Sequence, residues 1–333
     1  MRPILVFLIS FFVIDQSAQS ETSIRSEETL KIAHYLWHND FIEAINGAEI
    51  LARNEPANPV GRFMLGGIYQ TISEEYRTDR YKDTVIKYLD SAITLANERK
   101  ESDLDNADWY FIAGASQGYR ALYRAFHGNW WGAFKDGLQC SANLSKSLEL
   151  DSSFYDAYYA LGAYHYWKTT KSKIFLWLPF VRDRREEGIS EIKETIEHGY
   201  LATFNARETL LRVYLNEERF NEALALADSM NVINPRDPYC LLYYTQGLIA
   251  TGQIDDANEK LRSLRAAWKK SQFYDPFGFY EAEYYSAQIF LKKGDQETAR
   301  RIINKILSDK KKSKNNAYFA ETVDKAEALL TSF

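Results

Sequence analysis

The sequence has little of the residues that interrupt helices. Only 7 prolines and 16 glycines occur in 333 residues, and alternating runs of β-branched residues are scarce. Alanine, leucine, glutamate, lysine and arginine are plentiful, which favours an all-α protein over a sheet or barrel. Because a chain of this length exceeds what one compact core usually holds, either two domains or an elongated repeat array is expected.

Cysteine is almost absent as well. Cys140 and Cys240 are too few for a disulfide scaffold. They fall in helix pairs that are predicted to lie far apart, so both are expected to be free thiols. The sequence also lacks cysteine pairs for zinc, a phosphate loop and a nucleotide fingerprint, so no cofactor and no metal are expected. The net charge of −5 is mild, and the absence of a basic stripe excludes nucleic acid as a partner.

Only one apolar run approaches the length of a membrane segment. It spans residues 4–14, fewer than the ~20 residues that a spanning helix needs. Small residues follow at Ala18 and Ser20, so residues 1–20 are predicted to be a secretory signal peptide. The remaining residues 21–333 are then expected in the periplasm or outside the cell. An uncleaved amino-terminal anchor is the alternative.

The second half of the chain repeats with a period of 34 residues. The matched positions are Leu210, Tyr214, Phe220 and Ala223, followed by Tyr244, Leu248, Ile254 and Ala257. This is the period of a helix-turn-helix repeat that stacks on its neighbours. Small residues recur where paired helices must approach closely, at Ala44, Gly66, Gly162, Ala223, Ala257 and Ala299. Seven pairs are predicted, near residues 27–56, 59–97, 106–150, 155–199, 204–235, 238–270 and 280–308, and residues 316–331 are predicted to cap the open end.

These motifs, with "FMLGGIYQ", "YYALGAYHYW" and "HNDFIEAINGAEILARNEPANP", carry a family resemblance. The sequence resembles the tetratricopeptide-repeat (TPR) superfamily over about residues 27–310. The resemblance implies a right-handed superhelical solenoid of antiparallel helix pairs, forming a single domain over residues 21–333. It also implies a non-catalytic scaffold or adaptor that binds a protein or peptide partner on a concave surface.

In this class the first helix of each pair lines the concave surface. Counting within each repeat places Phe63, Gln70, Tyr110, Gln117, Tyr159, Tyr166, Asn205, Glu208, Arg212, Tyr239, Gln246, Tyr284 and Gln288 there. The chain contains 23 tyrosines, 19 phenylalanines and 7 tryptophans, most of which are expected in the core. The rest predict a tyrosine- and amide-rich binding surface. A glycan-binding envelope module is the alternative, because exposed tyrosines also stack on sugars.

An insertion at residues 168–187 interrupts the fourth pair. Its apolar octet, residues 174–181, lies between basic residues and is too short to span a membrane. Phe175, Trp177 and Phe180 are therefore expected either to cover apolar surface of the solenoid or to make a peripheral membrane contact. The stretch "PFVRDRREEGISEI" is also similar to one in the inclusion-body-clearance branch of repeat proteins, a similarity that transfers no activity.

Two patterns suggest catalysis and are weighed against packing. Gly114-Ala-Ser116-Gln-Gly118 matches the G-x-S-x-G of a hydrolase nucleophile elbow. Apolar residues around it recur at three- and four-residue steps, which predicts a helix with Ser116 among packing residues. His34 and His38 are four residues apart, a spacing that can bind a metal, but two ligands make a weak site. The sequence therefore predicts no enzyme, with a hydrolase using Ser116 as the remaining alternative.

Overall fold

The computed structural model describes residues 21–171 and 182–331, and this part of the chain forms helices and no strand. The helices are α1 (Glu27–Trp37), α2 (Phe41–Asn54), α3 (Val60–Tyr76), α4 (Lys82–Ser102), α5 (Ala107–Phe126), α6 (Trp130–Leu150), α7 (Asp156–Lys171), α8 (Arg185–His198), α9 (Thr203–Asn216), α10 (Phe220–Ile233), α11 (Pro238–Ala250), α12 (Ile254–Lys270), α13 (Pro276–Lys292), α14 (Gln296–Ser308), the 3-10 helix η2 (Lys310–Asn315) and α15 (Ala317–Leu330).

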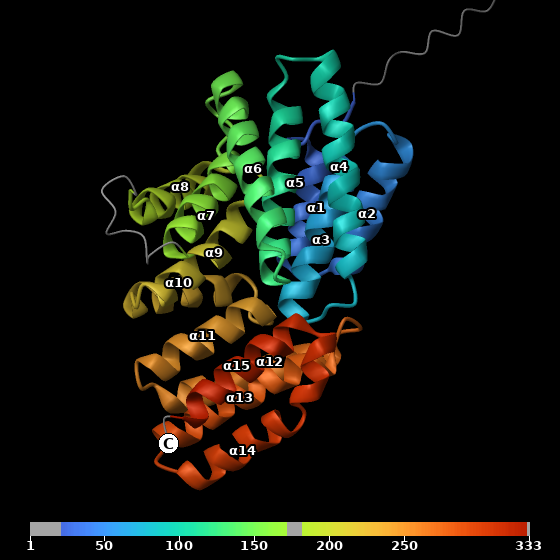
Figure 1. The fold of residues 1–333 in the computed structure, drawn as a ribbon. Coiled ribbons are helices and arrows are strands. Elements are labelled where there is room, and N and C mark those ends of the chain that lie inside the picture. Colours follow the sequence, from blue (N-terminus) through green and yellow to red (C-terminus); the bar gives the residue numbers. More distant parts are fainter. Residues whose placement is uncertain (1–20, 172–181, 332–333) are drawn as a thin grey trace, which may run out of the picture.

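Consecutive helices pack against each other as hairpins, and the pairs follow one another along the molecule (Figure 1). The seven predicted pairs are confirmed, each within a few residues of its expected bounds. The predicted cap is α15, which packs on α13 and α14. The all-α solenoid expected from the repeat pattern is therefore the fold of this chain.

Short-range sequence signals explain where helices begin and how closely they pair. Asp237 and Asp275 precede α11 and α13, and each side chain accepts a hydrogen bond from a backbone N–H two residues later. A proline follows each aspartate, at a position where a helix needs no N–H. In the fourth pair, a Cβ on Gly162 would lie 2.6 Å from the backbone oxygen of Gly188. Only glycine therefore allows α7 and α8 to approach this closely.

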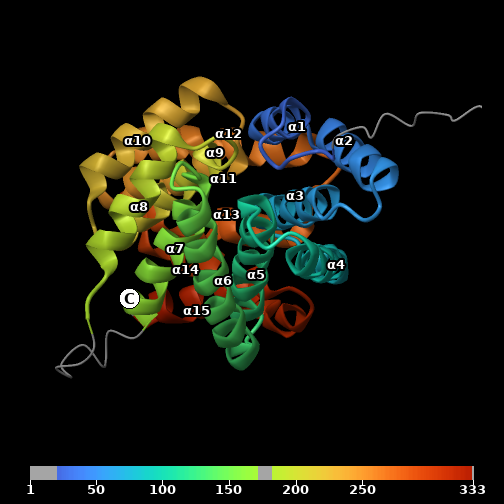
Figure 2. The ribbon, with the colours of Figure 1, turned by 90° about the horizontal axis from the view of Figure 1, so that it is seen from above.

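The solenoid turns far enough for its first helices to meet its later ones (Figure 2). The rings of Trp37 at the end of α1 and Phe204 on α9 have centroids 6.4 Å apart. Asn234, which ends α10, donates a hydrogen bond of 3.2 Å to the backbone oxygen of Trp37. Tyr200 donates one of 3.1 Å to the backbone oxygen of Ser26. The concave side is consequently more enclosed than that of an open stack.

The end of α3 is the point on which the carboxy-terminal helices converge. The indole N–H of Trp268 on α12 donates to the backbone oxygen of Glu75 at 2.7 Å. The side chain of Asn316 donates to the backbone oxygen of Arg77 at 2.9 Å. The guanidinium Nε of Arg77 lies 2.7 Å from Oε2 of Glu281 on α13, and both side chains are buried. Polar groups separated by about 200 residues in sequence thus hold the turn closed.

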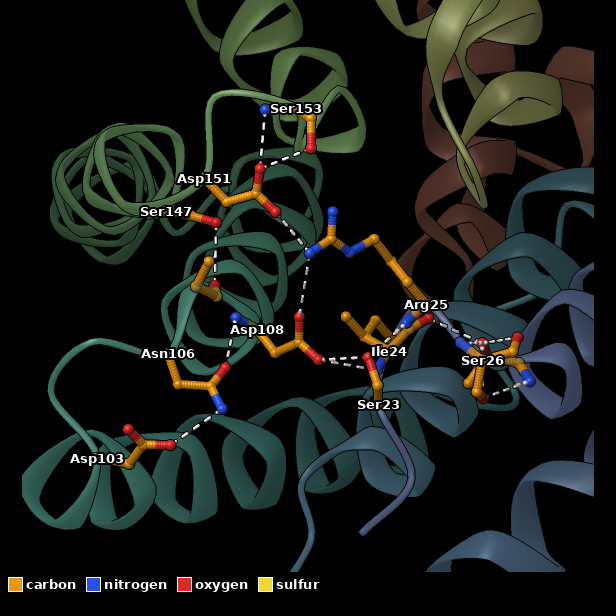
Figure 3. Close-up of polar contacts among 12 residues, drawn as sticks. Ser23, Ile24, Arg25, Ser26, Asp103, Asn106, Asp108, Ser147, Asp151 and Ser153 are labelled. Carbon is orange, nitrogen blue, oxygen red and sulfur yellow. Dashed lines mark hydrogen bonds and ion pairs between the residues drawn. The ribbon is translucent and has the colours of Figure 1, made fainter. Parts of the chain in front are cut away.

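The segment before α1 is held against α5 and the turn after α6 (Figure 3). Arg25 points between two acids, with Nη2 at 2.6 Å from Oδ2 of Asp151 and 4.0 Å from Oδ1 of Asp108. Its guanidinium also stacks over the ring of Phe154, 4.1 Å from the centroid. The hydroxyl of Ser23 donates to Asp108 at 2.6 Å. Arg25 therefore joins the first pair of the solenoid to the third and fourth.

Arg25→Ala is expected to lower the free energy of unfolding by about 1 kcal/mol. The ion pairs are partly exposed, which limits their contribution, while the stacking over Phe154 adds to it. Urea denaturation measures the change, and Arg236→Ala, at an exposed arginine, is the control. Equal unfolding midpoints for Arg25→Ala and the parent protein would contradict this account.

Three remaining expectations concern the cysteines and the apolar segments. Cys140 and Cys240 are both buried free thiols, and burial raises the pKa of the Cys140 thiol to about 12. No helix of the described ranges is long and apolar enough to cross a membrane. The predicted signal peptide and the octet with Phe175, Trp177 and Phe180 lie outside the described residues.

Candidate binding site

The thirteen residues predicted for the concave surface lie on the inner side of an enclosed turn, and none of them is exposed. Seven are buried, namely Phe63, Gln70, Gln117, Tyr166, Glu208, Tyr239 and Tyr284. The other six are half-buried, namely Tyr110, Tyr159, Asn205, Arg212, Gln246 and Gln288. The expectation of an open tyrosine and amide surface is therefore corrected, because neighbouring helices of the stack cover several of those positions, as the end of α9 does where Asn216 donates a hydrogen bond to the hydroxyl of Tyr166. Partner binding by the residues that still face a cavity stays a prediction.

A pocket of about 430 Å³ lies between α3, α5, α6 and α7, with α1 and the start of α9 adding to its wall. Three predicted residues line it, Phe63, Tyr159 and Asn205. The wall is almost wholly apolar, formed by side chains such as Met64, Phe111 and Trp167, and a few polar groups stand among them. A concave apolar site of this size is typical of binding pockets.

Small residues on one face of α5 leave room for this pocket. Ala115, Gly118, Ala121 and Ala125 follow each other at three- and four-residue steps and all line the wall. On α3, a Cβ added to Gly67 would meet one neighbour, Tyr119, at 3.9 Å. A larger side chain at Gly67 would extend into the pocket, while a Cβ on Gly118 would lie 3.0 Å from Sγ of Cys140.

Exposed apolar side chains gather beside the pocket, at the end of α5 and the start of α6. We call them the aromatic rim, and they are Leu122, Phe126, Trp130, Trp131, Phe134 and Leu138. Trp130 and Trp131 expose 61% and 68% of their surface, although tryptophan is usually well covered. Leu122, Trp130 and Phe134 also line the pocket, so the rim and the pocket form one continuous surface.

Sequence reasoning missed the aromatic rim because it counted positions only on the first helix of each pair. The rim lies largely on α6, a second helix. A signal was present in "GNWWGAF", where two adjacent tryptophans begin a helix. Adjacent residues on a helix point about 100° apart, so both cannot be buried against the same neighbour. One exposed tryptophan could therefore have been predicted there.

The charged groups near the pocket are already engaged. The carboxylate of Asp156 accepts hydrogen bonds from the backbone N–H groups of residues 200–202, which begin the chain toward α9. Asp136 pairs with Arg120 and Arg124. Lys168 lies at the edge, with Nζ 3.0 Å from the hydroxyl of Tyr164. This arrangement suits binding by apolar contact better than proton transfer.

The two catalytic candidates from the sequence differ in burial, since Ser116 is buried while His34 and His38 are exposed. Ser116 lies in the middle of α5 with none of its surface exposed, so the strand and turn of a nucleophile elbow are not present there. His38 follows α1, and its Nδ1 lies 2.8 Å from the backbone oxygen of His34. The two imidazole rings stack with their centroids 6.4 Å apart.

A second group of candidate residues lies in the enclosed centre, where α3, α9 and α11 meet. Glu75, Glu208 and Asp237 are all buried, and one carboxylate oxygen from each lies within 4.8 Å of the others. Burial, with the other acids nearby, raises the pKa of Glu75 and of Glu208 well above the usual range. Burial also raises the pKa of Asp237 to about 7. Of these three, only Glu208 was predicted as a site residue.

Comparison with known proteins finds likenesses among solved structures. No known family profile matches the chain, and no curated protein matches it. Similar solved structures include YrrB, described as a TPR protein with an unusual peptide-binding site (17% identity, 68% of this chain and 97% of that one, TM-score 0.43). They also include PilW, a widely conserved type IV pilus biogenesis factor (12% identity, 73% and 93%, TM-score 0.47). A third is a tetratricopeptide repeat protein from Parabacteroides merdae (14% identity, 91% and 98%, TM-score 0.41).

These likenesses concern the arrangement of helices and carry no information on a ligand. The fold itself, with seven successive helix pairs and a capping helix, is TPR-like. The resemblance drawn from the sequence is thereby confirmed for the fold.

Proposed function

We propose that this protein is a non-catalytic binding protein, which takes apolar side chains of a protein partner into the pocket between α3, α5, α6 and α7. The observation that carries the proposal is the continuity of an apolar pocket with the exposed aromatic rim. Soluble proteins seldom leave such a patch uncovered unless it serves an interaction. Export by residues 1–20 belongs to the same proposal, and the protein would then act outside the cytoplasm.

The residue types of the rim favour a protein partner. Tryptophan and other large aromatic side chains supply most of the binding energy at protein interfaces, especially around a desolvated centre. In the rim, Trp131 stacks near Phe134 with centroids 6.0 Å apart. Lys135 lies over the ring of Trp131, 5.3 Å from its centroid, and can reach a polar group at the edge of an interface. A partner segment with large apolar residues fits this surface.

A hydrocarbon chain of a lipid is the second candidate ligand. It is favoured by one observation, namely that the pocket wall offers few hydrogen-bonding groups. A peptide backbone placed inside would lack partners for its N–H and C=O groups, and such groups are costly to bury unpaired. If the ligand is a protein segment, its backbone therefore stays at the aromatic rim, and only its side chains enter the pocket.

Gly67→Leu is expected to weaken binding in the pocket without loss of stability. Leucine would fill the free space beside Gly67, and it favours a helix over glycine by roughly 1 kcal/mol. A displayed peptide library, selected on the full chain, should yield sequences rich in large apolar residues. The selected peptides should bind Gly67→Leu at least about tenfold more weakly, with Trp130→Ser causing a loss of similar size.

Val232→Ser provides the matched control, because Val232 is an apolar side chain that is 82% exposed and lies away from the rim. This variant should bind the selected peptides as the parent protein does. A fluorescent long-chain fatty acid is tested in parallel. The lipid would be the supported ligand if the parent protein binds the fatty acid, Gly67→Leu does not, and the peptide library yields no binding sequence. Peptide binding that is equal in Gly67→Leu and the parent would move the site away from the pocket.

A further inference from the structure

Three carboxylates from distant parts of the chain meet in the centre of the turn. Glu75 lies in the last turn of α3, Glu208 in the middle of α9, and Asp237 immediately before α11. Their exposed fractions are 3%, 7% and 1%. Because oxygens of all three lie within 4.8 Å of one another, their negative charges would repel strongly if nothing neutralised them.

Two oxygens of this group have no hydrogen-bond partner. Asp237 uses Oδ1 to accept the backbone N–H of Tyr239, and Glu75 uses Oε2 to accept from the side chain of Asn39 at 2.5 Å. Oδ2 of Asp237 and Oε1 of Glu208 are buried and unpartnered in the described structure. A buried acceptor without a partner is costly, so these atoms point to something that the protein itself does not supply.

Nearby basic residues are committed elsewhere. Within the described ranges, no lysine, arginine or histidine forms an ion pair with Glu75, Glu208 or Asp237. Arg77, the residue after α3, pairs with Glu281. Arg212, one turn after Glu208, stacks over the ring of Trp167 at 4.9 Å from its centroid. The charge of Arg77 lowers the pKa of Glu75, but burial and the neighbouring acids outweigh this effect, so direct ion pairing does not neutralise the three acids.

We propose that Glu75, Glu208 and Asp237 bind a divalent cation of the Ca²⁺ type. The three oxygens lie within 4.8 Å of one another. A cation placed centrally among them would therefore be no more than about 2.8 Å from each oxygen, which is 4.8 Å divided by the square root of 3. Ca²⁺ takes oxygen ligands at about 2.3–2.6 Å, so shifts of a few tenths of an ångström complete the contacts. Six to eight oxygens surround Ca²⁺ in proteins, and water would provide the remainder.

The donor set selects this class of cation over others. Three carboxylates are hard oxygen ligands, and zinc prefers nitrogen and sulfur donors. Mg²⁺ requires about 2.0–2.1 Å and near-octahedral geometry, which would demand a larger contraction of three packed helices. The site would join α3 to α9 and α11, so the cation would stabilise the closed turn.

Metal content and thermal unfolding of the full chain test the proposal. After dialysis against EDTA and its removal, about 1 mM CaCl₂ should raise the Tm by several degrees, because a ligand that binds only the folded state stabilises it. MgCl₂ should raise it less. Tb³⁺, a substitute for Ca²⁺, should become luminescent on excitation of tyrosine, since Tyr239 lies two residues from Asp237.

Glu208→Gln and Asp237→Asn are the informative variants, because each removes a charge and keeps the shape of the side chain. Asparagine also caps a helix as well as aspartate, so α11 should persist. Both variants should unfold at the same temperature as the EDTA-treated parent or higher, and should require at least about tenfold more CaCl₂ for the same shift in Tm. Tb³⁺ luminescence should fall in parallel.

Glu191→Gln is the control, since Glu191 belongs to the other cluster that could hold a metal ion, with His165 and Glu187, and therefore distinguishes the two clusters. It should keep the full response to CaCl₂. The proposal is overturned if the parent protein neither carries metal after purification without chelator nor responds to up to about 10 mM CaCl₂. It is equally overturned if Glu208→Gln and Asp237→Asn respond as the parent does.

Discussion

Trp268→Ala is expected to destabilise the protein by about 3–5 kcal/mol, the usual cost of removing a large buried aromatic side chain. Trp268 is 2% exposed on α12, and its indole N–H donates to the backbone oxygen of Glu75. The substitution would leave a cavity and an unpaired carbonyl at the end of α3. Because this contact holds the first half of the solenoid to the second, we expect the turn to open more readily.

Two comparisons separate packing from the hydrogen bond. Trp268→Phe should keep most of the packing and lose the hydrogen bond, for a smaller cost of about 1–2 kcal/mol. Trp131→Ala, in the exposed aromatic rim, should change stability by less than about 0.5 kcal/mol. Urea unfolding followed by circular dichroism gives all three values. A cost for Trp268→Ala no larger than that for Trp131→Ala would show that the closing contact does not stabilise the fold.

Arg77→Met is expected to cost about 3–5 kcal/mol. Removal of one member of a buried ion pair leaves the other charge without its partner, and this accounts for most of the loss. The side chains of Arg77 and Glu281 are both buried, and Nε of Arg77 lies 2.7 Å from Oε2 of Glu281. Lys325 also approaches Glu281, with Nζ at 3.4 Å, so part of the charge would still be balanced.

The double variant Arg77→Met with Glu281→Leu tests the physical reason. If the loss arises from the stranded carboxylate, removal of Glu281 should restore much of the stability, because apolar side chains often replace buried ion pairs at little cost. Lys325 retains Glu321 as a partner at 3.0 Å. Additive losses in the double variant would contradict this explanation. The backbone of Arg77 has a φ of 54°, a conformation that is strained for a residue other than glycine. Both variants carry methionine there, so the strain does not differ between them.

Local sequence signals predicted the helices and their pairing. The 34-residue period at Tyr214 and Leu248 placed successive helix pairs of the solenoid, and the sixth pair begins at residue 238, as predicted. Gly162 indicated a close approach, which the contact with Gly188 confirms. These features depend on residues within one or two helices of each other, so the pattern of a short stretch was sufficient to infer them.

The candidate site was predicted only in part. Phe63, Tyr159 and Asn205 line the pocket, while Tyr166, Tyr239 and Tyr284 are covered. Repeat position indicates which way a side chain faces relative to its own pair. It does not indicate what another part of the solenoid places over that side chain, and this decides exposure.

By itself the sequence determined an all-α chain of seven helix pairs with a cap, because helix formation and hairpin packing follow from composition, spacing and capping residues close together in the chain. The tertiary structure alone decided how far the solenoid turns. That turn is held by polar contacts between residues nearly 200 positions apart, such as Trp268 with Glu75. It leaves the aromatic rim exposed beside an apolar pocket and brings Glu75, Glu208 and Asp237 together. The repeat pattern of the sequence does not predict such contacts, because each depends on small rotations between successive helix pairs, summed over many pairs.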